Sequence, residues 1–315
     1  MVDFRYHLVS IIAVFLALAL GIVIGTTALN GEILDSLKSS IGTLTAEKRN
    51  LEGSVTELRQ QTATDQQLAD RIGPAAVAGQ LQGRRVVLVT LPNGSAAAAD
   101  ALVPLLQAAG ATVTGNVQLR GDLIDPERAA AVDAVITQVS PGGLDGAGTE
   151  TVQRASAELA AALVSSSAGS SISSSAADEV LAGFRDGNLI EADDDLGARA
   201  ELAVLVAGDP VTSDDATVRT ARARALLSFA AAFDAAGEGA VVAGPSAAAE
   251  EGGVVRALRD DGALSQRVSS VDGADQPQGR LVVVFALREQ AEGGSGRYGA
   301  GPGAQAAVPS LPAAG

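Results

Sequence analysis

The chain has no cysteine and no tryptophan, and it contains one methionine and one histidine. Without cysteine it forms neither a disulfide nor a thiolate metal site, although this absence assigns no cellular compartment. The one histidine, His7, lies near the N-terminus, which excludes a catalytic triad built on histidine within a downstream domain. No P-loop occurs, and no G-x-G-x-x-G fingerprint follows the first predicted strand. The residues therefore predict a protein that is not an enzyme and that holds no cofactor.

Basic and aromatic residues are also scarce, and the 315 residues carry a net charge of −15. Segments 1–33 and 34–73 each contribute −1, so the remaining residues carry −13. Such an acidic field argues against nucleic acid and against anionic lipid head groups as partners of that part. Aromatic residues make up only 3% of the chain, so its core must be built from alanine, valine and leucine.

An uncharged run of 22 residues, Leu8–Leu29, is the most informative feature that the chain does contain. As a helix it would extend about 33 Å, enough to cross the hydrocarbon core of a bilayer. It predicts one transmembrane helix, preceded by a short tail at residues 1–7 and followed by a large soluble part. Arg5 favours a cytoplasmic tail with the bulk of the chain extracytoplasmic. The alternative is a cleaved secretory signal, for which Thr26 and Ala28 offer a small-x-small cleavage site.

Small residues recur every four positions within this run, so they share one face of the predicted helix. They are Ala13, Ala17, Gly21 and Gly25. Small side chains let two helix backbones approach closely in lipid, which favours association of two such helices. Glycine and alanine are nevertheless common in membrane-spanning helices, so the stripe is also compatible with a helix that has no partner.

A heptad pattern follows the apolar run and predicts a coiled-coil stalk over residues 33–73, which Pro74 would end. The a positions are Leu34, Ile41, Lys48 and Val55, and the d positions are Leu37, Leu44, Leu51 and Leu58. Leucine at d with β-branched residues at a favours two parallel helices, as does an anchor that places every copy on one side of the membrane. Together the patterns predict a parallel homodimer. The alternative is that this helix packs on its own globular domain.

Alternating strand and helix patterns over residues 84–290 predict an α/β domain, with a mainly parallel sheet covered by helices. Apolar runs predict strands at Arg85–Leu91, Val113–Leu119, Leu202–Ala207, Ala240–Ala243, Val268–Val271 and Leu281–Ala286. Predicted helices occupy Ser95–Ala109, Pro126–Val139, Thr149–Leu163, Ala176–Phe184, Ala216–Ala235 and Ser246–Arg259. A serine-rich loop at 165–175 is a candidate boundary between two lobes. Residues 291–315, rich in glycine, alanine and proline, are predicted to be disordered.

Consecutive aspartates occur at 193–195, 214–215 and 260–261, where oxygen ligands could hold Ca²⁺ or Mg²⁺. Such runs are more often solvated turn residues. The segment Leu91–Ser95 could receive an anion at the start of the helix that follows it. Neither feature is specific enough to predict a metal, catalytic or cofactor site.

The start D-F-R-Y-H-L-V-S-I at Asp3–Ile11 is distinctive, and the segments S-S-V-D-G-A-D-Q-P-Q-G-R-L-V-V-V-F-A-L and R-Y-G lie near the C-terminus. With the heptad and the α/β pattern, they resemble the actinobacterial copper transporter family over nearly the whole chain. The resemblance implies a channel-forming protein of the mycobacterial outer membrane that is linked to copper efflux. It also implies relatives that act with a cytoplasmic-membrane partner in septal cell-wall remodelling. It assigns no ligand residues.

The residues themselves fit a copper pathway poorly, because cuprous ion prefers thiolate or thioether and cupric ion prefers imidazole. The predicted strands are short, uniformly apolar and separated by helices, unlike those of an outer-membrane barrel. Two hypotheses follow. The first is an envelope protein of this family that contributes to copper export, with pore formation, while an assembly handles the metal. The second, which the residues favour, is a dimeric extracytoplasmic scaffold whose α/β domain binds an envelope or septal cell-wall protein.

Overall fold

The structure is a computed structural model that describes residues 4–140, 144, 146–167, 172–193, 196–210, 212–213 and 215–310. For Phe4 and for residues 26–34 it describes the backbone alone. The chain divides into two compact units, Met1–Asp65 and Gln66–Gly315.

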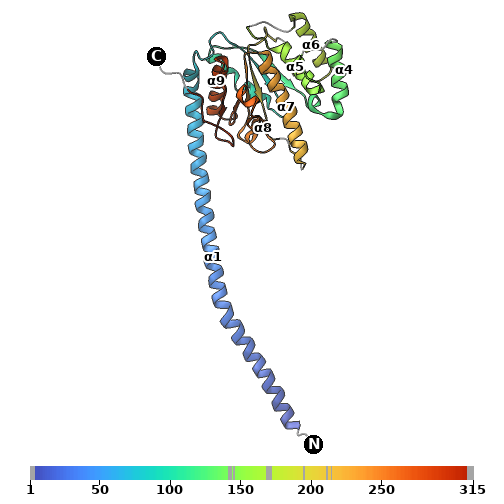
Figure 1. Cartoon of the computed structure of the whole chain (residues 1–315). Helices are drawn as coiled ribbons and strands as arrows, with labels where there is room; N and C mark the ends of the chain where they lie inside the picture. Colours follow the sequence, from blue (N-terminus) through green and yellow to red (C-terminus); the bar gives the residue numbers. More distant parts are fainter. Residues whose placement is uncertain are drawn as a thin grey trace. The chain divides into compact units, whose positions relative to one another are not determined.

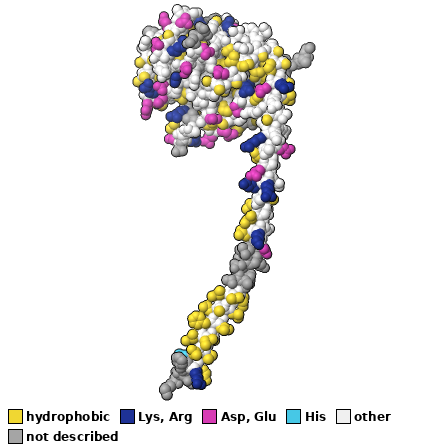
Figure 2. All heavy atoms as spheres, turned by 180° about the vertical axis from the view of Figure 1, so that it is seen from behind, with side chains coloured by type: hydrophobic (Ala, Val, Ile, Leu, Met, Phe, Trp, Pro, Cys, Tyr) yellow, Lys and Arg dark blue, Asp and Glu magenta, His cyan; other side chains and the backbone are white. Residues whose placement is uncertain are grey.

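One long helix, α1 (Phe4–Val77), makes up the first unit and continues into the second (Figure 1). Its segment Arg5–Gly25 has a mean hydropathy of 2.9 and no buried side chain, and it is long and apolar enough to cross a membrane. Figure 2 shows hydrophobic side chains around this segment and charged side chains farther along the helix. It is the one such segment in the part of the chain that the structure describes. The predicted span Leu8–Leu29 is helical along its whole length.

The prediction that Pro74 ends this helix is wrong, because α1 continues to Val77. Proline removes one backbone hydrogen bond from a helix, and packing of the last turn offsets this loss. A Cβ built on Gly73 would lie 2.9 Å from a methyl carbon of Leu281, and Val77 is completely buried. Tertiary contacts within the second unit therefore determine where α1 ends.

Seven strands of the described chain form one sheet in the second unit, in the order β3-β2-β1-β4-β5-β6-β7. They are β1 (Arg85–Thr90), β2 (Thr112–Leu119), β3 (Ile190–Ala192), β4 (Leu202–Val206), β5 (Gly239–Ala243), β6 (Ser269–Val271) and β7 (Arg297–Tyr298). Every neighbouring pair is parallel except β2 and β3, which are antiparallel. The uninterrupted apolar runs become the central strands β4 and β5, which are buried throughout, as parallel strands covered on both faces must be.

Helices cover both faces of the sheet and bury an apolar layer on each, with α9 on one side and α7 on the other (Figure 1). One layer contains α4 (Ala129–Val139), α5 (Thr151–Leu163), α6 (Ser174–Asp186), α7 (Ala216–Ala236) and α8 (Val254–Asp260). The other contains the end of α1 with α2 (Ala96–Asp100), α3 (Val103–Ala108) and α9 (Pro277–Ala291). Short 3₁₀ helices lie in the connections, at η1 (Gly121–Ile124), η2 (Pro126–Arg128), η3 (Ser246–Ala249) and η4 (Leu264–Gln266). The predicted α/β fold with a mainly parallel, helix-covered sheet is confirmed.

The predicted strand Leu281–Ala286 is wrong, because these residues lie within helix α9. A short apolar run that is buried on most sides has no periodicity that separates a strand from a helix. Pro277 occupies the first turn of α9, where its fixed φ suits a helix and its missing N–H costs nothing. Val283 and Val284 are both completely buried, so consecutive positions of this helix are apolar, as they also are in a strand that is buried on both faces.

The C-terminal segment is also ordered where disorder was predicted, over residues 291–310. Arg297–Tyr298 forms the edge strand β7, and Tyr298 is 3% exposed. The N–H of Gly299 donates to the carbonyl oxygen of Ala306 at 3.0 Å, so the chain turns back beyond β7 and Ala306 lies beside the end of that strand. Residues 311–315 lie outside the described residues.

The serine-rich segment at 165–175 does not divide the sheet, because strands from both sides of it join the same sheet. Residues 168–171 of this segment lie outside the described residues. Just before them, Val164 forms an isolated parallel bridge with Ala200, directly ahead of β4.

Candidate functional site

The small residues predicted to mediate helix association all lie on the apolar segment of α1. Ala13, Ala17, Gly21 and Gly25 are exposed. A Cβ built on Gly21 or on Gly25 meets no atom within 4 Å, so this face leaves room for a second backbone. Association through this face stays a prediction.

The predicted a and d side chains of the stalk form an exposed apolar stripe along α1. Between 44% and 67% of each is exposed for Leu37, Ile41, Leu44, Leu51, Val55 and Leu58. Lys48, at an a position, pairs along the helix with Glu52 at 3.6 Å. The side chain of Leu34 lies outside the described residues. A partner helix buries such a stripe in a coiled coil, and that partner stays a prediction.

A crevice opens at the edge of the sheet where the parallel strands end. The last residues of β1, β4, β5 and β6 are neighbours in register, namely Thr90, Val206, Ala243 and Val271. The loops that follow these strands therefore meet at one edge. The chain leaves β1 toward β2 on one side and leaves β4 toward β5 on the other. Open α/β sheets bind ligands at such a switch point, at the carboxyl ends of the strands.

Two glycines let the loops after β1 and β4 touch. A Cβ on Gly208 would lie 1.5 Å from the carbonyl oxygen of Asn93, and a Cβ on Gly94 would lie 2.4 Å from that of Val206. The Asn93 side chain joins the loops, because its Nδ2 donates to the carbonyl oxygen of Asp209 at 2.7 Å. With the loops after β5 and β6, they surround a cavity of about 310 Å³.

The ionisable side chains that line this crevice, among the described residues, are the carboxylates of Asp209 and Asp275. They make the crevice unfavourable for the anion considered at Leu91–Ser95. The helix that follows this segment, α2, is only five residues long and adds little dipole. The negative charge of the crevice therefore disfavours the binding of phosphate-like ligands.

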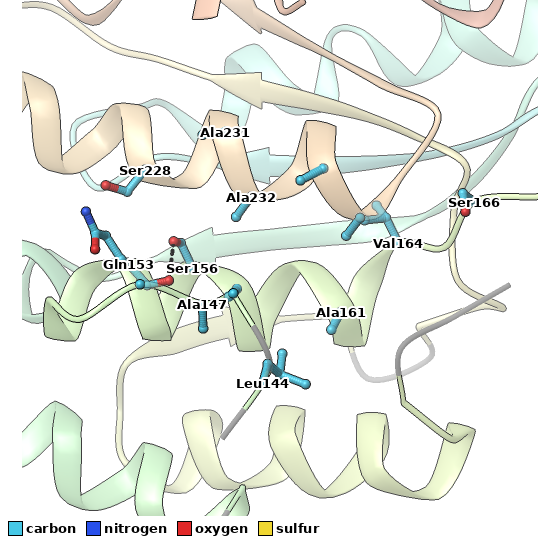
Figure 3. A pocket seen from close by; sticks show the side chains of 15 residues that line it. Leu144, Ala147, Gln153, Ser156, Ala161, Val164, Ser166, Ser228, Ala231 and Ala232 are labelled. Carbon is cyan, nitrogen blue, oxygen red and sulfur yellow. Dashed lines mark hydrogen bonds between the residues drawn. The ribbon is translucent and has the colours of Figure 1, made fainter. Parts of the chain in front are cut away.

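A larger cavity, of about 790 Å³, lies between α5 and α7 (Figure 3). Gln153 and Ser156 on α5 lie opposite Ser228 and Ala232 on α7 in Figure 3. The Ser156 hydroxyl donates to the Gln153 carbonyl oxygen at 2.8 Å. The described residues that line this cavity include no ionisable side chain, so they offer neither a general acid nor a general base.

Glu158 of α5 is a buried carboxyl group that lines neither cavity, and it is 1% exposed. Burial raises its pKa above the ordinary value, and a hydrogen bond with the Ser140 side chain partly opposes this rise. Its Oε2 has no hydrogen-bond partner among the described residues. Without access to either cavity, Glu158 is a feature of helix packing rather than a candidate acid or base.

Within the residues that the structure describes, no group of three or more His, Cys, Asp or Glu side chains is placed to hold a metal ion. Asp260 pairs with Arg256 at 2.8 Å, and Asp261 accepts from two main-chain N–H groups that follow it. Asp193 accepts from a main-chain N–H of β2 at 2.8 Å. The aspartates of these runs that lie outside the described residues are Asp194, Asp195 and Asp214. Asp215 accepts from the N–H of Thr217 at 2.7 Å at the start of α7, so the described members of these runs bind main-chain N–H groups or an arginine.

Sequence reasoning missed a buried ion pair between Arg259 of α8 and Asp272, which follows β6. The two side chains are 0% and 3% exposed and lie 2.7 Å apart. The guanidinium also donates to the carbonyl oxygen of Tyr298 at 2.7 Å. Asp272 and Tyr298 belong to the two C-terminal segments that carry the family resemblance, so these segments meet here. Their composition signalled turns and a strand, but not this contact.

Comparison with known proteins gives matches over almost the whole chain. A family model described as "Copper transport outer membrane protein, MctB" matches residues 1–309. The copper transporter MctB of Mycobacterium tuberculosis (strain ATCC 25618 / H37Rv) is 30% identical over 319 residues, which cover 98% of this chain and 100% of that protein. The copper transporter MctB of Mycobacterium leprae (strain TN) is 28% identical over 327 residues, which cover 96% of this chain and 98% of that protein.

Proposed function

The chain belongs to the family of the copper transport outer membrane protein MctB, and from this premise we propose that it anchors a copper-handling assembly in the cell envelope. Family membership makes it a membrane-associated envelope protein related to copper transport. In the proposal it is a non-enzymatic scaffold: α1 spans the membrane, the stalk pairs with a second copy, and the α/β domain binds another envelope protein. The N-terminal tail is cytoplasmic and the bulk of the chain is extracytoplasmic.

The observation that carries this proposal is the exposed apolar stripe of the stalk, which follows a segment long and apolar enough to cross a membrane on one continuous helix. A lone helix cannot bury such a stripe, whereas two parallel helices bury it against each other. Anchors in one membrane place all copies in the same direction, so the parallel pairing needs no other device. The open face at Gly21 and Gly25 supports the same pairing within the lipid.

Copper is cargo in this proposal, and other components hold it. Thiolate, thioether and imidazole are the side chains that copper prefers, and the chain offers only Met1 and His7. Pore formation by assembled anchor helices is the alternative. The span Leu8–Leu29 contains no charged side chain. Ion pores are lined by rings of charges or of backbone carbonyls, so the residues favour a tether over a channel.

We expect cysteine at Leu44 or at Leu51 to form an intermolecular disulfide in membranes that contain the full chain. Side chains at d positions of a parallel pair face each other within reach of a disulfide. The native chain has no cysteine, so every crosslinked band comes from the introduced residue. Non-reducing electrophoresis after mild oxidation measures the dimer fraction.

Cysteine at Ala46 or Gln60, which lie at f positions of the same heptads, is the matched control and should remain monomeric. Equal crosslinking at Ala46 and Leu44 would indicate random collision rather than a defined pair. The absence of a crosslink at both Leu44 and Leu51 would contradict the proposed parallel dimer.

A strain that lacks this protein should lose copper tolerance, and a copy with His7→Ala should restore tolerance as fully as the native copy. In this proposal other components bind the copper, so removing the one imidazole of this chain should not change how tightly the assembly binds the metal. A copy with Leu44→Glu and Leu51→Glu should fail to restore tolerance, because like charges then oppose the pairing of stalks. Growth across a copper series measures both outcomes at matched protein levels.

Septation is scored in the same strains. Copper hypersensitivity with normal septation supports the copper-handling role. Division defects with normal copper tolerance would replace that role with a scaffold for septal cell-wall proteins. Failure of the His7→Ala copy to restore tolerance would contradict the assignment of copper to other components.

A further inference from the structure

We propose that the crevice at the carboxyl edge of the sheet binds a small organic cation, an ammonium or guanidinium group on a short apolar stem. The crevice lies at the switch point between β1 and β4, and four loops that are far apart in the sequence form it. Its volume of about 310 Å³ lies at the lower end of the range for small-molecule pockets. A ligand with few heavy atoms is the size that fits.

The lining separates into an apolar wall and an acidic rim. Ala98, Leu102 and Pro245 contribute apolar surface, whereas Asp209 and Asp275 contribute carboxylates. Both aspartates are exposed, so a cation can reach them from solvent. No lysine or arginine is among the described residues of this lining. A positive charge at the rim and an apolar stem along the wall match this division.

Asn93 lines the same site, in the loop that follows β1. Its Nδ2 donates a hydrogen bond to the carbonyl oxygen of Asp209, and this bond fixes the orientation of the side-chain amide. Its Oδ1 is buried and has no hydrogen-bond partner among the described residues. This oxygen has almost no accessible surface, so recognition rests on the Asp209 and Asp275 carboxylates, which can accept from the several N–H donors of a guanidinium or ammonium group. An ionised phosphate or carboxylate offers these two side chains no such donor and is repelled by their charge.

The basic residue nearest to this site in sequence is Arg280, and other groups already bind its guanidinium. Its Nη1 donates to the main-chain oxygen of Asp275 at 3.1 Å, and its Nη2 pairs with Asp70 at 3.6 Å. Gln276 donates to the Asp275 carboxylate at 2.8 Å, which holds this side chain at the rim. The carboxylate is thus positioned by an uncharged donor rather than neutralised by a cation.

The test uses the full chain in nanodiscs of zwitterionic lipid and two probes of one shape, butylguanidinium and butylurea. Titration calorimetry, corrected with empty nanodiscs, should show saturable binding of butylguanidinium and none of butylurea. Binding should weaken as salt is raised, because the rim carboxylates are partly exposed. A third probe, an acetylated and amidated Gly-Arg-Gly peptide, separates two sources of the same group. Binding of the peptide as well would assign the site to a partner's arginine side chain, and binding of butylguanidinium alone to a free small cation.

Variants assign the binding to this crevice. Asp209→Asn and Asp275→Asn should each weaken butylguanidinium binding by about three- to fivefold, the effect of one partly exposed charge pair. Ala98→Phe keeps both charges but fills the cavity, and it should abolish binding. Asp100→Asn is the matched control, because Asp100 lies on the same short helix but outside the lining. Circular dichroism confirms that each variant is folded.

Three outcomes would overturn the proposal. The first is equal binding of butylguanidinium and butylurea, which would show that the positive charge is not recognised. The second is an equal effect of Asp100→Asn and the two rim variants. The third is the absence of saturable butylguanidinium binding to the native chain at millimolar concentration.

Discussion

Replacing Arg259 by methionine should lower the free energy of unfolding by about 3–5 kcal/mol, the cost of removing one partner from a buried ion pair. The Arg259 guanidinium and the Asp272 carboxylate are 0% and 3% exposed and lie 2.7 Å apart. Methionine preserves much of the side-chain volume but leaves the carboxylate charged and unpaired in the interior. Urea unfolding of the purified chain, followed by circular dichroism, measures the loss.

The same substitution should release the C-terminal segment before the domain unfolds. The Arg259 guanidinium donates to the carbonyl oxygens of Tyr298 at 2.7 Å and Pro302 at 2.9 Å. From the other side, the N–H groups of Ala300 and Gly301 donate to the Asp272 carboxylate at 3.0 and 3.1 Å. Limited proteolysis should therefore cut the variant within residues 297–310 under conditions that leave the native chain intact.

Arg256→Ala is the matched control on the same helix. Arg256 pairs with Asp260 at 2.8 Å, but the two side chains are 41% and 60% exposed, so the loss of stability should be far smaller than that of Arg259→Met. Adding Asp272→Asn to the methionine variant should recover part of the lost stability, because no unpaired charge then remains buried. Equal losses for Arg256→Ala and Arg259→Met would contradict the assigned role of the buried pair.

The sequence did not predict this ion pair, and it predicted some elements of the fold better than others. Val-rich runs bounded by turn residues predicted the central strands, because a parallel strand buried on both faces requires continuous hydrophobicity. The run Leu281–Ala286 has the same composition and lies in α9, since continuous hydrophobicity does not distinguish a buried strand from a buried helix. The edge strands β3 and β7 are only three and two residues long, too short for a periodic pattern.

The candidate site was less predictable than the fold, for a topological reason. The crevice combines loops after four strands, and the sequence places Asn93 more than a hundred residues from Asp209. Each loop contains ordinary turn residues, which predicted strand ends and nothing more. Only the strand order brings the loops together and places their carboxylates on one rim. The a/d stripe of the stalk, by contrast, is a local pattern that can be read from the sequence alone, and its burial by a partner helix stays a prediction.

Introducing lysine at both Leu16 and Leu20 should remove the chain from the membrane. Both side chains lie within the apolar segment Arg5–Gly25 and near the middle of the predicted span Leu8–Leu29, where each charge costs about 2.5–3.5 kcal/mol of insertion free energy. Two charges one turn apart exceed what the rest of the span can offset, so the variant should become soluble or be degraded. Sedimentation after alkaline carbonate extraction measures the membrane-bound fraction.

Lysine at both Ala46 and Gln60 adds the same charge to the stalk and should leave the chain in the membrane pellet. Intact-mass measurement of the native protein from that pellet should include residues 1–28, because an anchor is retained whereas a secretory signal is removed. Recovery of a soluble native species that begins just after Ala28 would replace the anchor with a cleaved signal. The stalks would then lack a common membrane to align them, and the argument for parallel pairing would rest on the heptad alone.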